Sequence, residues 1–222
     1  WTYAELARNL AALCAWLRQQ DVRPGDRVMV VAENCIAQAA LVLAISAAEA
    51  WSVVVNARLS AREIDLIRDH SGARRVVYTV AVSSDARAHA ERHGATFLDA
   101  PGVGPLALGP LASVVLPEPA AADPTKQVAV LLYTSGTTGA PKGVMLSHRS
   151  ILFVAGTARA MRDLGPEDRF YGVLPVAHIV GFATVLVAAL LAGASVYLAP
   201  RFQPEVALAT LSQQRITRFP GV

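Results

Sequence analysis

Residues 2–98 alternate between short apolar runs and longer segments with helical periodicity, and this alternation restricts the fold more than any other feature of the sequence. The apolar runs have the length of strands and lie at 27–32, 51–55, 75–79 and 96–98. The helical segments lie between them at 2–20, 34–48, 60–70 and 84–93. Thr2 with Glu5 and Ser60 with Glu63 have the spacing of a capping box, and Asn34 is the expected cap of the second helix. Strands that alternate with helices predict an α/β fold with mainly parallel sheets flanked by helices.

Residues 100–126 interrupt this alternation with a segment rich in proline, alanine and glycine. Such a composition predicts a connector, with one short strand expected at 113–116. The alternation then resumes, with strands expected at 128–132, 143–146, 169–174, 195–198 and 216–219 and helices at 147–164, 181–192 and 204–214. We therefore divide the chain into a first α/β region (1–99), the connector (100–126) and a second α/β region (127–222).

The expected strand at 128–132 runs directly into the segment YTSGTTGAPKGVMLSH at 133–148. Four of the five positions from 134 to 138 carry hydroxyl groups, namely Thr134, Ser135, Thr137 and Thr138. Gly136 and Gly139 allow backbone N–H groups to face a bound anion, and Lys142 adds a positive charge. Because each hydrogen bond to a charged oxygen contributes about 1.5–3 kcal/mol, several together offset the dehydration of a polyphosphate. The segment therefore predicts a phosphate-binding loop.

Two other interpretations of this segment explain it less well. A glycine- and threonine-rich surface turn would explain an isolated GTTG, but not the whole stretch. The Walker loop has a lysine that directly follows a glycine and precedes serine or threonine. Here Pro141 precedes Lys142 and Gly143 follows it, so that motif is not matched.

Residues 133–143 resemble the signature [YF]TSG[ST]TGxPKG of the adenylate-forming enzymes, which include acyl-CoA synthetases, luciferases and the adenylation domains of peptide synthetases. The match contains no departure. The resemblance implies that ATP is bound by Thr134, Ser135, Gly136, Thr137, Thr138, Gly139 and Lys142. It also implies that Lys142 is catalytic, and that ATP and Mg²⁺ serve as cofactors and CoA as co-substrate.

Three further segments resemble motifs of the same family. WTYAEL at 1–6 is similar to its entry motif [LWF][TS]YxEL, and NARLS at 56–60 is similar to a stretch typical of acyl- and aryl-CoA synthetases. Two nearby positions depart from the pattern, because the family commonly has glycine at the position of Glu49 and proline at that of Val54. PVAHIVG at 175–181 matches the pattern P-x-x-H-x-x-G. The resemblance implies substrate-binding roles for His178 and Gly181, although His178 alone would more often be a buried structural residue.

The resemblance implies a partial N-terminal domain of the adenylate-forming fold. The family's acidic Mg²⁺ motif, ribose-binding aspartate and C-terminal catalytic lysine have no counterpart among these residues, so no metal ligand is expected. His89 and His93 are spaced i, i+4 without a third ligand, and an exposed helix face is expected there.

We therefore expect an AMP-forming acyl-CoA synthetase-like ligase that acts on a fatty or aryl acid, with the 222-residue chain itself inactive. Two alternatives remain open: an adenylation domain for amino acids or other acids, and a non-catalytic nucleotide-binding fragment. An activity assay would distinguish them. The first would activate amino acids, and the second would bind nucleotide without reaction.

Composition restricts the partners. The net charge of +3 and the scattered arginines argue against nucleic acid. Hydrophobic residues make up 54% of the chain and charged residues 17%, so self-association is expected. The uncharged run 182–199 is divided by Gly193, which predicts a buried helix and strand and no transmembrane segment. No signal peptide opens the chain, and Cys14 and Cys35 lie in apolar surroundings, so reduced thiols and a cytoplasmic location are expected.

Overall fold

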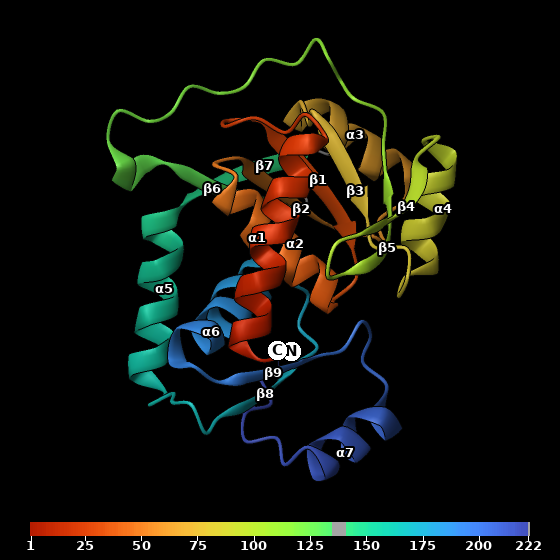
Figure 1. Ribbon diagram of the computed structural model, residues 1–222. Coiled ribbons are helices and arrows are strands. Elements are labelled where there is room, and N and C mark those ends of the chain that lie inside the picture. Colours follow the sequence, from red (N-terminus) through yellow and green to blue (C-terminus); the bar gives the residue numbers. More distant parts are fainter. Residues whose placement is uncertain (135–140, 222) are drawn as a thin grey trace.

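The computed structural model describes residues 1–134 and 141–221, which form two sheets and the helices around them (Figure 1). The strands are β1 (Arg27–Ala32), β2 (Trp51–Asn56), β3 (Arg75–Tyr78), β4 (Thr96–Ala100), β5 (Gly104–Leu108), β6 (Val128–Thr134), β7 (Lys142–Ser147), β8 (Arg169–Gly172) and β9 (Ser195–Leu198). The α-helices are α1 (Tyr3–Gln19), α2 (Ile36–Ala47), α3 (Ala61–Ser71), α4 (Ser84–Arg92), α5 (His148–Met161), α6 (Ala188–Ala192) and α7 (Pro204–Gln213). A 3₁₀-helix η1 (Pro124–Lys126) and a π-helix η2 (Val180–Val187) complete the order.

The first sheet has a parallel centre and antiparallel borders, in the order β4-β5-β3-β1-β2-β6-β7. Strands β3, β1, β2 and β6 run parallel, with Val30 opposite Val54 and Val54 opposite Leu132. β5 and β7 pair antiparallel with β3 and β6, respectively. The four parallel strands therefore end at one side of the sheet, which we call the carboxyl edge, and ligand sites of open α/β sheets lie at this edge.

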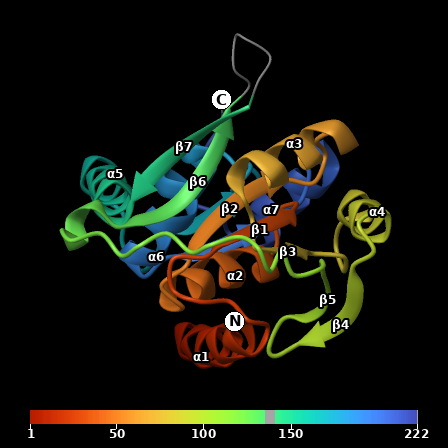
Figure 2. The same ribbon diagram turned by 90° about the horizontal axis from the view of Figure 1, so that it is seen from above.

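Helices cover both faces of this sheet, as the alternation predicted (Figure 2). Val28 and Val30 of β1 pack with Leu13 of α1 and Leu41 of α2. Met29 and Val31, which alternate with them, belong to the opposite core together with residues of α3 and α4. The central strands β1, β2 and β3 are thus buried on both faces, as their continuous apolar sequences require.

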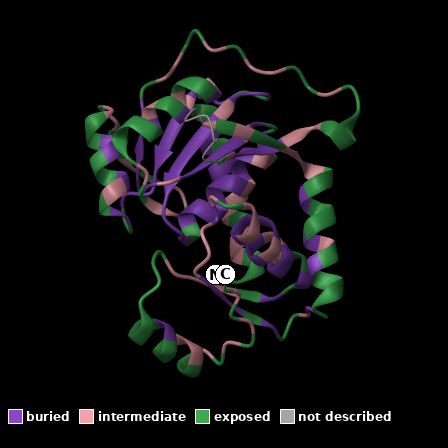
Figure 3. Cartoon of the chain, turned by 180° about the vertical axis from the view of Figure 1, so that it is seen from behind, coloured by how far each residue is buried: buried purple, intermediate pink, exposed green. Residues whose placement is uncertain are grey.

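The second sheet consists of the parallel strands β8 and β9. It lies below the first sheet in Figure 1, with α7 beyond it. A third core joins the two regions, because Phe182 and Leu186 of η2 pack with Val54 of β2 and Leu132 of β6. Figure 3 shows that the first sheet is largely buried, whereas α5 and α7 carry exposed surfaces.

No helix in the described part of the chain has the length and apolar character needed to cross a membrane. The uncharged run 182–199 is divided among η2, α6 and β9, which confirms its prediction as helix followed by strand. Cys14 and Cys35 are both free and buried, as expected.

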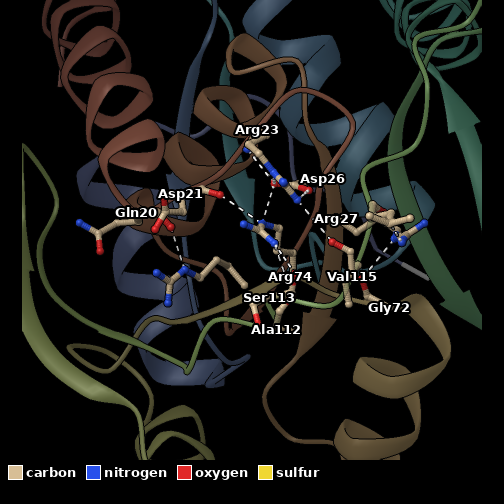
Figure 4. A network of polar contacts seen from close by, with 12 residues as sticks. Gln20, Asp21, Arg23, Asp26, Arg27, Gly72, Arg74, Ala112, Ser113 and Val115 are labelled. Atoms are coloured by element: carbon tan, nitrogen blue, oxygen red, sulfur yellow. Dashed lines mark hydrogen bonds and ion pairs between the residues drawn. The ribbon is translucent and has the colours of Figure 1, made fainter.

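The connector differs from its prediction. The strand expected at 113–116 is wrong, because no strand lies there; the connector instead contains β5 at Gly104–Leu108, which pairs with β4 and β3. Instead, the carbonyl groups of Ala112 and Ser113 accept hydrogen bonds from Arg74 at 3.5 and 3.4 Å (Figure 4). Arg74 also pairs with the fully buried Asp26 at 3.1 Å. Side-chain donors therefore satisfy backbone groups that a ladder would otherwise pair.

Three further predictions were wrong. Cys35 rather than Asn34 caps α2, because its Sγ accepts a hydrogen bond from the N–H of Gln38 at 3.4 Å. Burial raises the pKa of the Cys35 thiol. His89 is buried and contacts the carbonyl of Ala57 at 3.0 Å. The His93 side chain is only 7% exposed and bonds Asp65 at 2.7 Å, so this helix face is not exposed. The strand expected at 216–219 is reduced to one bridge between Phe170 and Arg218.

Glu49, where the family pattern commonly has glycine, has a backbone conformation that favours glycine. Glu49 follows the C-cap Ala48 of α2 and has φ +61°, the left-handed region that favours glycine. We expect Glu49→Gly to raise the free energy of unfolding by about 1 kcal/mol, measured by denaturant titration. Glu49→Ala is the control, because it removes the charge but keeps Cβ. An equal gain in both variants would assign the effect to the side chain and contradict the backbone explanation.

Candidate active site

The root of the predicted phosphate loop is a hairpin at the carboxyl edge. β6 ends at Thr134 and β7 begins at Lys142, and these two residues face each other in the ladder. Both are exposed. Ser135, Gly136, Thr137, Thr138 and Gly139 lie outside the described residues. The hairpin thus places Thr134 and Lys142, both predicted to bind phosphate, at the two ends of the segment 135–141.

Tyr133 anchors this root to helix α3. Its hydroxyl lies 2.9 Å from Nδ1 of His70, and the two rings meet edge to face at 5.8 Å. Burial raises the pKa of Tyr133, which keeps the phenol protonated. Its ring also lies against Gly143, where an added Cβ would come within 3.0 Å of the Tyr133 Cζ. Gly143 therefore lets the Tyr133 ring lie close against β7. The anchoring role of His70 was not predicted from the sequence.

The PVAHIVG segment follows β8, and its last two residues are the first two of η2. Val176 is buried with 1% of its surface exposed, whereas the side chain of His178 is exposed. The His178 N–H donates to the carbonyl of Pro175 at 2.9 Å, and its Nδ1 lies 3.4 Å from the N–H of Val180. The backbone thus fixes a turn that presents His178 to solvent.

Gly181 lets η2 approach this turn. A Cβ at this position would lie 2.2 Å from the carbonyl oxygen of Pro175 and 2.6 Å from that of Leu174. The helix expected at 181–192 is wound as a π-helix over Val180–Val187 and as α-helix only over Ala188–Ala192. π-helical segments occur frequently at functional sites, and this eight-residue one begins two residues after His178.

Asn34 holds the same segment from the end of β1. Its Nδ2 donates to the carbonyls of Gly172 at 3.0 Å and Leu174 at 2.9 Å. Its Oδ1 accepts from the N–H of Val176 at 2.9 Å. Asn34 was expected to be a helix cap. A polar side chain directly after a buried strand at the carboxyl edge was the signal for this other role.

Glu33, the neighbour of Asn34, binds two arginines. Its side chain is 2% exposed, and Arg201 contacts it at 2.7 and 3.1 Å. Arg58 of the NARLS segment lies 3.7 Å away, and Arg201 also pairs with Asp85 at 2.8 Å. Glu33 and Arg201 line a pocket of about 460 Å³. The buried carboxylate is thereby compensated, as a buried charge requires.

The described residues contain no group of three or more His, Cys, Asp or Glu side chains that could hold a metal ion. No residue at 1–134 or 141–221 is therefore assigned to Mg²⁺. The described edge offers a hydroxyl group at Thr134, an ammonium group at Lys142 and an imidazole group at His178. These groups can bind anionic oxygens and stabilise the charge of a leaving group.

Comparison with known proteins places the whole chain in one family. The family model described as AMP-binding enzyme matches residues 1–222. A feruloyl-CoA synthase of Amycolatopsis sp is 34% identical over 229 residues, covering 100% of this chain and 43% of that protein. A long-chain-fatty-acid–CoA ligase of Mycobacterium tuberculosis is 31% identical, covering 97% of this chain and 43% of that protein. The chain thus spans less than half the length of these relatives.

Solved structures agree in fold. ATP-bound MatB from Rhodopseudomonas palustris aligns with a TM-score of 0.74 and 26% identity, covering 95% of this chain and 42% of that one. The inhibitor-bound N-terminal domain of FACL13 from Mycobacterium tuberculosis aligns with a TM-score of 0.76 and 25% identity, covering 98% and 55%. The family match over the whole chain and these likenesses lead to one conclusion: the chain belongs to the family of AMP-binding enzymes.

Proposed function

We propose that the protein containing this chain is an ATP-dependent ligase that converts a carboxylic acid to its CoA thioester through an acyl-adenylate. The observation that carries the proposal is the hairpin that presents Thr134 and Lys142 at the two ends of the loop with the adenylate-forming signature. Its position at the carboxyl edge of a parallel sheet agrees with the usual place of ligand sites in such sheets.

The reaction has two steps. A carboxylate oxygen attacks the α-phosphorus of ATP and pyrophosphate leaves; the thiol sulfur of CoA then attacks the acyl carbon, loses its proton and displaces AMP. The proposed phosphate-binding residues are Thr134, Ser135, Gly136, Thr137, Thr138, Gly139 and Lys142. Lys142 stabilises the charge that develops on pyrophosphate, and His178 and Gly181 border the carboxylate. Mg²⁺ enters with ATP as part of the substrate.

The proposed substrate is a fatty or aryl acid. The NARLS segment at 56–60 supports this class, and so do the names of relatives that include a feruloyl-CoA synthase, a long-chain-fatty-acid–CoA ligase and a 4-coumarate–CoA ligase. A cytoplasmic location belongs to the same proposal and is supported by the two free cysteines.

The test uses a protein of the relatives' length that contains these residues. Incubation with ATP, Mg²⁺, CoA and a panel of fatty, aryl and amino acids should yield AMP and a thioester with a fatty or aryl acid only. Chromatography of both products measures the result. Amino-acid-dependent pyrophosphate exchange without a CoA thioester would contradict the proposal and favour an amino-acid adenylation domain.

For the 222-residue chain alone we propose nucleotide binding without turnover, together with self-association. The outer face of α5 supports the second point, since Leu152, Phe153 and Met161 are 51%, 73% and 82% exposed. Light scattering measures the oligomeric state. A monodisperse monomer that adenylates a carboxylate would contradict both statements.

A further inference from the structure

The side chain of Asn34 joins the two sheets at the carboxyl edge. Asn34 is 4% exposed and follows β1 by two residues. Its three hydrogen bonds, of 2.9–3.0 Å, go to backbone groups of Gly172, Leu174 and Val176. These partners are alternate residues of the segment that leaves β8. The segment bends at Leu174, so a single amide reaches all three of these backbone groups.

The chemistry of these contacts specifies an amide. Two of the three partners are carbonyl oxygens and need a donor, whereas the third is an N–H and needs an acceptor. A primary amide supplies both functions, but a carboxylate has no donor and would place its charge beside two carbonyl oxygens. The partners thus also fix which way the amide points, with nitrogen toward Gly172 and Leu174.

The segment that Asn34 holds leads directly to His178. Pro175, between the bonded residues Leu174 and Val176, accepts the N–H of His178 at 2.9 Å. The carbonyls of Leu174 and Pro175 are also the atoms against which Gly181 packs. Displacement of this segment would therefore move the His178 turn and the start of η2 together.

We propose that Asn34 is a positioning residue that sets the location of His178 at the carboxyl edge and thereby the affinity for the carboxylate substrate. This inference rests on the proposed function for its catalytic consequence. Its structural part stands on the three hydrogen bonds and can be tested separately.

Hydrogen exchange of the 222-residue chain tests the structural part. Asn34→Asp preserves the shape of the side chain but removes both donors. We expect peptides covering 173–180 to exchange about tenfold faster, with β1 and α2 unchanged.

Glu33→Gln is the matched control. This buried neighbour contacts Arg201 and Arg58, so its replacement should affect peptides near 201 and leave the exchange of 173–180 unchanged. If Asn34→Asp does not fold, as judged by circular dichroism, Asn34→Ala takes its place. Unchanged exchange at 173–180 in a folded Asn34 variant would overturn the inference.

Kinetics of the full-length enzyme test the catalytic part. Asn34→Asp should raise KM for the acid about tenfold while KM for ATP changes less than twofold. In a His178→Ala background, the same substitution should have little further effect, because the two residues act as a unit.

Equal changes in both KM values, or independent effects in the double variant, would overturn the inference. Absence of any carboxylate-dependent reaction in the unaltered enzyme would instead reject the proposed function, and the exchange experiment would still decide on the hydrogen bonds.

Discussion

Replacement of Lys142 by alanine is expected to slow acyl-adenylate formation by about 100- to 1000-fold, the usual effect of removing one preorganised group that stabilises developing charge. Lys142 is the only cationic residue in the signature at 133–143. Its backbone is fixed opposite Thr134, and its side chain is exposed at the root of the loop. An ammonium group on a flexible stem can follow the leaving pyrophosphate as charge moves onto it. ATP–pyrophosphate exchange in the full-length enzyme measures this step.

The chain offers a matched control for this variant. Lys126 is the only other lysine and lies in η1, just before β6 begins at Val128. Because β6 separates it from the carboxyl edge, Lys126→Ala should leave exchange within about twofold of the unaltered rate. Circular dichroism confirms folding of both variants. Normal pyrophosphate exchange in Lys142→Ala would exclude this lysine from the mechanism.

Replacement of Gly181 by alanine is expected to lower the free energy of unfolding by about 3 kcal/mol. An added Cβ would lie 2.2 Å from the carbonyl oxygen of Pro175, well inside any permitted contact. The carbonyl oxygen of Leu174, at 2.6 Å, would also be too close. Both atoms belong to the backbone, so no side-chain rotation relieves the clash. η2 and the His178 turn must separate, which breaks the third core. Denaturant unfolding of the 222-residue chain measures the loss.

Gly156 in α5 provides the opposite case. A Cβ there would meet nothing within 4 Å. Alanine is favoured over glycine inside a helix by about 1 kcal/mol, so Gly156→Ala should stabilise the chain. Helix propensity alone would predict the same sign at both positions. Stabilisation by Gly181→Ala would therefore show that the close contact between η2 and the His178 turn does not exist.

Elements determined by local interactions were predictable from the sequence. The capping boxes at Thr2 and Ser60 are present with both of their hydrogen bonds, and β1 has the predicted bounds Arg27–Ala32. A capping box involves residues three positions apart, and a buried strand is indicated by a continuous apolar run. The order of helices and strands follows from these signals.

Elements determined by distant partners were not predictable. β5 lies in a segment rich in proline and glycine and is a strand because β4 and β3 pair with it. Asn34 has the residue type of a helix cap, but its partners lie more than a hundred residues further along the chain. His89 lies on a polar helix yet is buried against the carbonyl groups of Ala57 and Leu59. Local sequence carries no information about such partners.

The candidate site divides in the same way. Thr134, Lys142, His178 and Gly181 belong to contiguous motifs and were found from the sequence, although their chemical roles stay predictions. Asn34 and His70, which hold these motifs in place, were not found, because each acts on a segment that is remote in the chain. Sequence motifs identify groups that meet a substrate more readily than they identify the groups that support them.

The pairing of β6 with β2 also bears on how the molecule folds. Ser52 faces Val130 in this parallel pair, so the two strands meet only after α3, β3, α4 and the whole connector have been spanned. Closing so long a loop is entropically unfavourable, and contacts between residues distant in sequence form slowly. The strands β1, β2 and β3 pair over shorter separations and can form first. The hairpin that carries Thr134 and Lys142 is then added to an existing template, so this part of the carboxyl edge is one of the last parts of the molecule to assemble.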